Sequence, residues 1–257
     1  MTQNEIRQIV ANEFSLFEQE YHHLTDSPVQ LIRDVNAYVD RRSGKRMRPL
    51  LLLLSAGGRD SQRASKLAAA MEMLHSASLM HDDVVDMSME RRGQDSVNGH
   101  WGNQVAVLCG DYYLSRVMMV MNELDDKRAT SIVDDTVKTM CEGELLQLQY
   151  LMGHQYDNSR YMDIIYRKTG ALMTACCELG DALLRQYGVC FGTAFQVRDD
   201  LMDYGTEDTT MLPDKSVLES ELHRLVGEAV DCLAQRPATI YTEALRCLAL
   251  NLLDTSF

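Results

Sequence analysis

The chain has 257 residues, 46% of them hydrophobic and 25% charged, which is the ordinary composition of a globular protein that buries a full core. Its formal net charge of -13 argues against a nucleic-acid-binding surface, which would need a basic stripe. The chain has only four prolines and no linker-like stretch, and it is rich in residues that favour helices. We therefore expect an all-α protein that forms one domain, with two small domains as the alternative.

Seven cysteines lie within the expected helices and form no CxxC pair. This pattern is typical of buried, reduced thiols in the cytoplasm rather than of disulfides or a zinc site. The first residues, MTQNEIRQIV, lack the basic start and apolar core of a signal peptide. The longest apolar run, at 50–54, is far shorter than the roughly 20 residues that span a bilayer. We expect a cytoplasmic protein without a transmembrane segment.

Two amphipathic helices are expected over residues 2–21 and 27–42, with a polar break at 25–27 between them. The segment 41–49, RRSGKRMRP, then concentrates positive charge in an acidic protein. This segment is either a solvated turn that leads into the next helix or an anion-binding segment. In the second case Lys45 and Arg48, just before a helix, could reach the anion.

A long helix is expected to run from Ser61 to an acidic triplet in HDDVVD. Asp82 and Asp86 are four residues apart, so they lie on one face of the helix and repel each other. Carboxylates among apolar neighbours need a cation, and oxygen ligands without a thiolate favour magnesium. A single DDxxD triplet is nevertheless more often an acidic surface. His75 lies two turns before Asp82 on the same face. It is either a core residue or a residue that contacts a ligand held above the metals.

The region after this helix includes two adjacent guanidiniums, Arg91 and Arg92, which suit either a wet surface or bidentate phosphate binding. Several breakers then predict a loop over residues 94–103. Three helices are expected after the loop, at about 104–122, 127–152 and 157–179.

Two groups of side chains in these later helices have a structural and a functional interpretation. The cluster Met118, Met119 and Met121 is interpreted as core filling. Lys168 and Thr169 interrupt an apolar helix, where a charge without a partner is costly. Lys168 is therefore either a lysine whose ammonium extends to water or a phosphate ligand.

A second acidic triplet repeats the spacing of the first. Asp199, Asp200 and Asp203 lie in FQVRDDLMD, again within an apolar helical run. Two such triplets, more than a hundred residues apart in the sequence, predict two walls of one site for several cations. A diphosphate is the anion that best shares those cations.

Six segments carry a resemblance to a known family, in order and in spacing: GKRMRP; EMLHSASLMHDDVVD followed by MERRGQ; GNQVAVLCGDYYL; EGELLQL; RKTGAL; and FGTAFQVRDDLMDY. Over about residues 40–207 the chain resembles the trans-type polyprenyl diphosphate synthases, in wording closest to the medium to long-chain branch. The resemblance implies a single-domain orthogonal helical bundle of the isoprenoid synthase type, with about ten helices around a central cavity. It also implies a homodimer and about three Mg²⁺ ions in each substrate-loaded site.

The same resemblance implies roles for individual residues. The catalytic set would be Asp82, Asp83, Asp86, Lys168, Thr169, Gln196 and Asp199. The metal ligands would be Asp82, Asp86, Asp199 and Asp203, with Asp200 as a supporting carboxylate. The residues that bind the isopentenyl and allylic diphosphates would be Lys45, Arg48, His75, Arg91, Arg92 and Lys168. The oxygens of Thr169 and Gln196 would face the developing allylic cation.

The length of the isoprenoid product in this family depends on the bulk of the residues just before the first triplet. Here these residues are Ala77 and Ser78, and their small size predicts a linear product longer than fifteen carbons, which could pass to a membrane. Residues deeper in the cavity, around Leu108, Cys109 and Tyr112, would set the final length. A terpene cyclase and a non-catalytic subunit of a heteromeric synthase remain the alternatives.

The chain departs from the family in two places. It looks abridged near 180/181 and near 207/208, and no lysine follows the second triplet before Lys215, although the family carries a diphosphate-binding lysine in that loop. Either the loop is deleted, or residues there are missing or disordered. We favour the second, since a direct step from Gly180 to Asp181 would join two helices with almost no turn.

Overall fold

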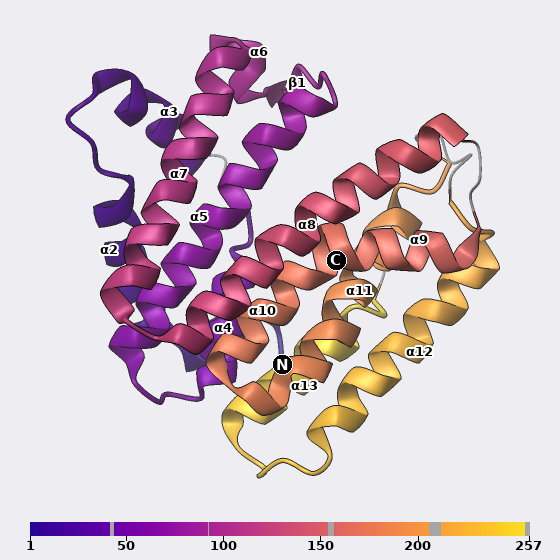
Figure 1. The fold of residues 1–257 in the computed structure, drawn as a ribbon. Coiled ribbons are helices and arrows are strands. Elements are labelled where there is room, and N and C mark those ends of the chain that lie inside the picture. Colours follow the sequence, from indigo (N-terminus) through magenta and orange to yellow (C-terminus); the bar gives the residue numbers. More distant parts are fainter. Residues whose placement is uncertain (42–43, 92, 154–156, 206–211, 255–257) are drawn as a thin grey trace. The chain divides into compact units, whose positions relative to one another are not determined.

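The computed structural model describes residues 1–41, 44–91, 93–153, 157–205 and 212–254. The regular secondary structure of these residues is helical except for one two-stranded hairpin (Figure 1). The hairpin pairs β1 (Glu90–Arg91) with β2 (Gln94–Asp95) in antiparallel register. The expected all-α class is confirmed.

The chain divides into two compact units. Unit 1 contains Met1–Val10, Leu51–Arg59 and Lys127–Phe257, and unit 2 contains Ala11–Leu50 and Asp60–Asp126. A single domain stays a prediction.

In unit 2 the longest helix is also the most buried. Helix α5 packs against α2 and α7, and its residues from Leu67 to Met71 have no exposed surface. A helix that is apolar on all sides belongs inside a core, and Asp60 caps its start by accepting from the Arg63 N–H. The helices of this unit are α2 (Ala11–Thr25), α3 (Gln30–Arg41), the start of α4 (Met47–Ala56), α5 (Ser61–Val85), α6 (Val97–Trp101) and α7 (Asn103–Leu124).

In unit 1 the corresponding buried helix is α11. It packs against α10, α12 and the π-helix η1, and its side chains Tyr187, Phe191 and Val197 have no exposed surface. The elements of this unit are α1 (Gln3–Ile9), the end of α4, α8 (Lys127–Gly153), α9 (Asn158–Ile165), η1 (Tyr166–Gly170), α10 (Ala171–Gly180), the 3-10 turn η2 (Ala182–Leu184), α11 (Arg185–Met202), α12 (Lys215–Leu233) and α13 (Ile240–Asn251).

Three expected elements differ from those observed. The helix expected over 2–21 is broken at Val10, because α1 packs on α13 whereas α2 packs on α5. The loop expected over 94–103 contains β2 and the short helix α6, which Ser96 caps through the Gly99 N–H. The helix expected over 157–179 contains the π-helix η1.

The interpretation of the methionine cluster as core filling is wrong for two of its three members. Met121 is buried, but Met118 is 71% exposed and Met119 is 56% exposed. Position on the helix explains the difference, since these residues lie on the outer face of α7. By contrast, the seven cysteines are free thiols, as expected, although Cys141 is exposed and Cys232 and Cys247 are half-buried. Among the described residues, no helix is both long and apolar enough to cross a bilayer.

The connection between α10 and α11 depends on Asp181. This residue is extended (φ -151°, ψ 121°) and accepts from the Leu183 N–H at 3.0 Å. Its carboxylate also pairs with Arg59 at 2.9 Å and with Arg236. One extended residue and the turn η2 therefore carry the chain past 180/181, whereas the expected gap near 207/208 lies outside the described residues.

We expect Asp181→Asn to lower the free energy of unfolding by about 2 kcal/mol at pH 7, because charged hydrogen bonds contribute roughly that much. Burial raises the pKa of Asp181, but the bonds from Leu183, Arg59 and Arg236 outweigh burial and hold the pKa below its usual 3.8. A carboxylate with a lowered folded pKa stabilises above its unfolded pKa and loses that contribution as pH falls through the folded pKa.

Urea unfolding at several pH values measures this effect. The difference between wild type and Asp181→Asn is expected to stay constant from pH 7 to about 5 and to shrink below about 4. Asp135→Asn is the control, since its salt bridge to Lys138 is exposed and worth little. A difference that does not change with pH would contradict the assignment.

Candidate functional site

The two acidic triplets occupy equivalent positions in their units. Asp86 is the C-cap of α5, and its N–H donates to the Asp82 carbonyl at 2.8 Å. Asp203 is the C-cap of α11, and its N–H donates to the Asp199 carbonyl at 3.1 Å. In each unit the triplet thus forms the C-terminal end of a helix that packs in the core.

Carboxylates at this end of a helix are electrostatically unfavourable. The helix dipole places partial negative charge at the C-terminus, where cations stabilise and anions destabilise by about 0.3–1 kcal/mol each. A protein that puts three aspartates there twice gains from a bound cation in both places. Hard oxygen ligands one turn apart fit Mg²⁺, which takes one or two carboxylates together with substrate phosphates. Within the described residues, no group of three or more His, Cys, Asp or Glu side chains is arranged to hold a metal.

The middle aspartate of the first triplet is held differently from its neighbours. Asp83 is 3% exposed, and its carboxylate accepts from Arg91 Nε at 2.8 Å and pairs with Arg91 Nη2 at 2.7 Å. Asn98 donates to the Asp83 carbonyl at 3.2 Å. Asp83 therefore fixes Arg91, and with it the hairpin, at the end of α5.

The histidine before this triplet contacts α7. An added Cβ at Gly110 would lie 2.3 Å from His81 Nε2, so the ring fills the space that glycine leaves. The same nitrogen is 3.3 Å from the Val107 carbonyl and 3.4 Å from Asp111. His81 therefore fixes α5 against α7.

The π-helix η1 directs two adjacent side chains to different helices. Lys168 Nζ is 2.7 Å from Glu144 and donates to Gln147 at 3.0 Å, both on α8. Thr169 donates to Gln196 Oε1 on α11 at 2.8 Å. Short π-helical segments inside α-helices are often found at functional sites. Lys168 is thus paired with a carboxylate, and its role as a phosphate ligand stays a prediction.

Glycines allow η1 to approach both neighbouring helices closely. An added Cβ at Gly143 of α8 would lie 2.5 Å from Arg167 Cβ, and one at Gly192 of α11 would lie 2.9 Å from Gly170 Cα. Real Cβ contacts are not this short, so only glycine fits at these crossings. The motif RKTGAL therefore packs between the other two motifs, EGELLQL on α8 and FGTAFQVRDD on α11.

A hydrogen-bonded chain links η1 to the second triplet. Thr169 donates to Gln196 Oε1, and Gln196 Nε2 donates to Asp200 Oδ1 at 2.8 Å. The other oxygen of Asp200 accepts from the hydroxyl of Tyr161, which is 2% exposed and lies on α9. Sequence reasoning missed Tyr161, although its place two helical turns before Lys168 is a signal that could have found it.

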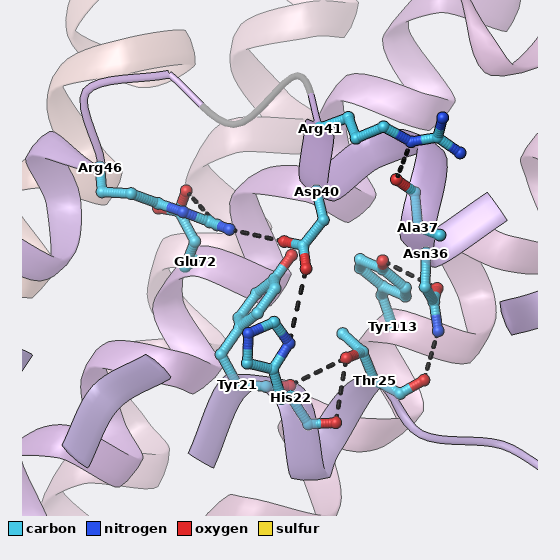
Figure 2. Close-up of polar contacts among 10 residues, drawn as sticks. All are labelled: Tyr21, His22, Thr25, Asn36, Ala37, Asp40, Arg41, Arg46, Glu72 and Tyr113. Atoms are coloured by element: carbon cyan, nitrogen blue, oxygen red, sulfur yellow. Dashed lines mark hydrogen bonds and ion pairs between the residues drawn. The ribbon is translucent and has the colours of Figure 1, made fainter. Parts of the chain in front are cut away.

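The basic segment before α4 is anchored by an arginine that sequence reasoning also missed. Arg46 pairs with Asp40 at 2.8 Å and with Glu72 at 2.9 Å, and its guanidinium lies 4.4 Å above the Tyr21 ring. Figure 2 shows Arg46 reaching across to Glu72 and Asp40, with Tyr21 beside them. Asp40 is also 3.5 Å from His22.

The expected isopentenyl diphosphate residues are placed around this anchor. Lys45 is exposed and precedes Arg46, and Arg48 is half-buried in the first turn of α4. His75 is half-buried on α5, one turn after Glu72. The pair Arg46–Glu72 therefore ties the segment that carries Lys45 to the helix that carries His75. Arg92 lies outside the described residues.

The expected chain-length residues also lie on α5. Ala77 has no exposed surface, and Ser78 is half-buried and donates to the His75 carbonyl at 2.9 Å. Of the deeper residues considered, Cys109 is 4% exposed, whereas Leu108 is 68% exposed. Tyr112 donates to the Asp26 carbonyl at 2.9 Å.

The described residues thus form a helical protein in which a DDxxD triplet ends one buried helix in each unit. The model of the family Polyprenyl synthetase matches residues 29–216, and the chain belongs to this family.

Known proteins resemble the chain in sequence and in fold. The all-trans-nonaprenyl-diphosphate synthase (geranyl-diphosphate specific) of Rhodobacter capsulatus is 38% identical over 217 residues, which cover 79% of this chain and 66% of the relative. The octaprenyl diphosphate synthase of Escherichia coli is 33% identical over 219 residues, covering 80% and 68%. The chain spans about two thirds of the length of these curated relatives. A polyprenyl synthase from Caulobacter crescentus, complexed with calcium and isoprenyl diphosphate, has a TM-score of 0.90 and 25% identity, with 99% of this chain and 98% of that chain covered.

Proposed function

We propose that the protein is a cytoplasmic trans-prenyltransferase that condenses an allylic diphosphate with isopentenyl diphosphate to give a linear polyprenyl diphosphate. The observation that carries the proposal is the repeated C-terminal acidic triplet, which makes each buried helix end a place for a divalent cation. Membership of the polyprenyl synthetase family and the names of both relatives support the same reaction.

The metal in this proposal is magnesium, about three ions per site, held by Asp82, Asp86, Asp199 and Asp203. Bound magnesium would neutralise charge on the diphosphate and so make it a better leaving group. The Caulobacter polyprenyl synthase, which has the same fold, is complexed with calcium and isoprenyl diphosphate. The donor set fits, because all four side chains offer only carboxylate oxygens.

The residues of this chain would bind and orient the two substrates. Lys168 and Arg91 would exchange their carboxylate partners Glu144 and Asp83 for the allylic diphosphate, while Lys45, Arg48, His75 and Arg92 would bind isopentenyl diphosphate. The carbon–oxygen bond of the allylic substrate breaks, and its electron pair leaves with the diphosphate. The double bond of isopentenyl diphosphate then attacks the allylic carbon. A proton leaves the adjacent carbon to the released diphosphate, and a new double bond forms.

One assay separates this proposal from its rivals. The purified chain is incubated with magnesium, labelled isopentenyl diphosphate and either geranyl or farnesyl diphosphate, and the products are separated by chromatography. Linear elongation supports the proposal. Cyclic products that contain no label from isopentenyl diphosphate would instead indicate a terpene cyclase. The absence of any product would favour a non-catalytic subunit. If elongation requires magnesium, a chelator should abolish it and added magnesium should restore it.

We propose a product longer than fifteen carbons, supported by the small residues Ala77 and Ser78 and by the names of the relatives. Ser78→Phe is expected to shorten the main product by at least one isoprene unit, since a half-buried position can accept an aromatic ring. Ala77→Tyr is expected to shorten it too, but also to lower stability by about 1–3 kcal/mol, because Ala77 is fully buried.

Chromatography of the products measures the chain-length effect. Ser115→Phe is the matched control, because Ser115 is exposed on α7 and its hydroxyl also donates to a backbone carbonyl one turn earlier. Unchanged product lengths in both Ser78→Phe and Ala77→Tyr would place the chain-length determinant elsewhere.

We also propose that the protein is a homodimer. The outer face of α7 exposes Leu108, Met118 and Met119 by 68%, 71% and 56%. Exposed apolar side chains that gather on one helix are typical of a protein interface. Light scattering of the purified chain measures its mass in solution.

A further inference from the structure

Asp200 determines which groups donate and which accept in the hydrogen-bonded chain from Tyr161 to Thr169. An ionised carboxylate can only accept hydrogen bonds. Both carboxylate oxygens of Asp200 therefore accept. Oδ2 accepts from the Tyr161 hydroxyl, and Oδ1 accepts from the amide NH₂ of Gln196.

The direction then passes along the chain to Thr169. Because Gln196 uses its NH₂ group on Asp200, its carbonyl oxygen faces Thr169 and must accept there. Thr169 consequently donates its only hydroxyl proton to Gln196, at 2.8 Å. Away from these bonds Thr169 keeps oxygen lone pairs, and Gln196 keeps a lone pair on its carbonyl oxygen together with the second N–H of its amide.

We propose that Tyr161 and Asp200 are positioning residues that keep Thr169 and Gln196 in this acceptor state, so that both present negative potential to the allylic cation. The inference rests on the proposed function, since it names the part of the site that would stabilise the positive charge. Preorganised dipoles stabilise a developing charge strongly because they need not reorient during the reaction. A neutral amide in place of Asp200 could donate to Gln196 and reverse the whole chain.

The burial of Tyr161 supports this role. Its hydroxyl is the end of a side chain that is only 2% exposed, and it lies on α9, a helix separate from η1 and α11. A tyrosine needed only for packing would not require its hydroxyl to meet a triplet carboxylate. The buried Tyr187 provides the comparison, since its hydroxyl donates to the Leu245 backbone carbonyl at 2.8 Å.

The test compares Asp200→Asn, Tyr161→Phe and the control Tyr187→Phe in the full chain. Asp200→Asn is expected to lower kcat by about a hundredfold and Tyr161→Phe by about tenfold, with KM for both substrates within about twofold, because one or two hydrogen bonds act only in the transition state. Tyr187→Phe is expected to lose stability like Tyr161→Phe but to keep its kcat.

A binding measurement gives a readout that does not depend on turnover. The probe is an ammonium analogue of the farnesyl cation, added with inorganic diphosphate and magnesium. Its Kd is expected to rise about tenfold in Tyr161→Phe, while the Kd of diphosphate and magnesium alone stays within about twofold. In Tyr187→Phe both values should match wild type.

The outcomes separate this inference from the proposed function. If wild type elongates but Tyr161→Phe and Asp200→Asn keep kcat and analogue affinity, the positioning role is wrong and the proposed function stands. If KM rises while kcat is unchanged, the two residues act on substrate binding and the inference is also wrong. If wild type neither elongates nor binds the analogue, the proposed function fails and the inference fails with it.

Discussion

We expect Asp86→Asn to lower kcat for elongation by roughly a thousandfold, about 4 kcal/mol of transition-state stabilisation, while the protein becomes more stable. The loss follows from removing a carboxylate proposed to hold magnesium against the leaving diphosphate. The gain follows from the position of Asp86, which is exposed and caps the C-terminal end of α5. Removing a negative charge there is worth about 0.3–1 kcal/mol.

Opposite changes in activity and stability distinguish a metal site from an acidic surface. Steady-state kinetics with magnesium and urea unfolding without magnesium measure the two quantities on the same preparations. Asp95→Asn is the matched control, because Asp95 is exposed on β2, just beyond the same triplet, and its loss should leave kcat within about twofold. If Asp86→Asn keeps its kcat, the first triplet is not part of the catalytic machinery.

The same reasoning predicts a parallel result in unit 1. Asp203→Asn removes the carboxylate at the equivalent C-cap of α11. We expect a smaller loss of kcat, about a hundredfold, with a similar gain in stability. If both substitutions lower kcat and raise the magnesium concentration needed for half-maximal rate, the two triplets serve one reaction.

The sequence alone predicted the class and the long helices, because these depend on local periodicity. The helix from Ser61 to the first triplet was found with its start, which Asp60 caps in the structure. The aspartate spacing was equally readable, and the structure places both triplets at helix ends. Whether they act together is still a prediction.

Features that depend on distant contacts could not be predicted in this way. Nothing in YRKTG marks a π-helix, because the glycines that let this segment approach its neighbours closely, Gly143 and Gly192, lie on other helices. The break at Val10 arises because α1 and α2 pack on different partners. The outer face of α7 looked like core because methionine composition does not say which side of a helix is covered.

Arg46 is the most informative example of such a distant contact. The basic segment was interpreted through Lys45 and Arg48, and Arg46 between them was given no role. Its partners Asp40 and Glu72 are 6 and 26 residues away, which no local pattern shows. Arg46 also adopts a left-handed conformation (φ 45°), which costs roughly 1–2 kcal/mol in a residue with a side chain. The ion pairs must offset that cost.

We expect Arg46→Met to lower the free energy of unfolding by about 3–5 kcal/mol, because removing one member of a buried ion pair leaves the other charge without compensation. The guanidinium side chain is 14% exposed and that of Glu72 is 9% exposed, so water cannot replace the lost contact. Burial alone would lower the pKa of Arg46, but Glu72 and Tyr21 outweigh burial and raise it. The charge is therefore present throughout the pH range in which the protein folds.

Two further variants show whether the charge itself is responsible. Arg46→Lys keeps the charge but loses the planar group that bonds two carboxylates and stacks on Tyr21 (Figure 2), so an intermediate loss of about 1–2 kcal/mol is expected. The double variant Arg46→Met, Glu72→Met should recover part of the loss, since hydrophobic replacement of a whole buried pair is often nearly neutral.

Urea unfolding of the three variants measures these differences. Arg224→Met is the control, because Arg224 also contacts two carboxylates, Glu221 and Glu228, but is 48% exposed on α12, and exposed pairs contribute at most about 1 kcal/mol. Isopentenyl diphosphate saturation of Arg46→Lys extends the test to function, since loosening the segment beside Lys45 should raise KM for that substrate alone. If Arg46→Met is no less stable than Arg224→Met, Arg46 does not anchor the segment, and its charge is available for substrate after all.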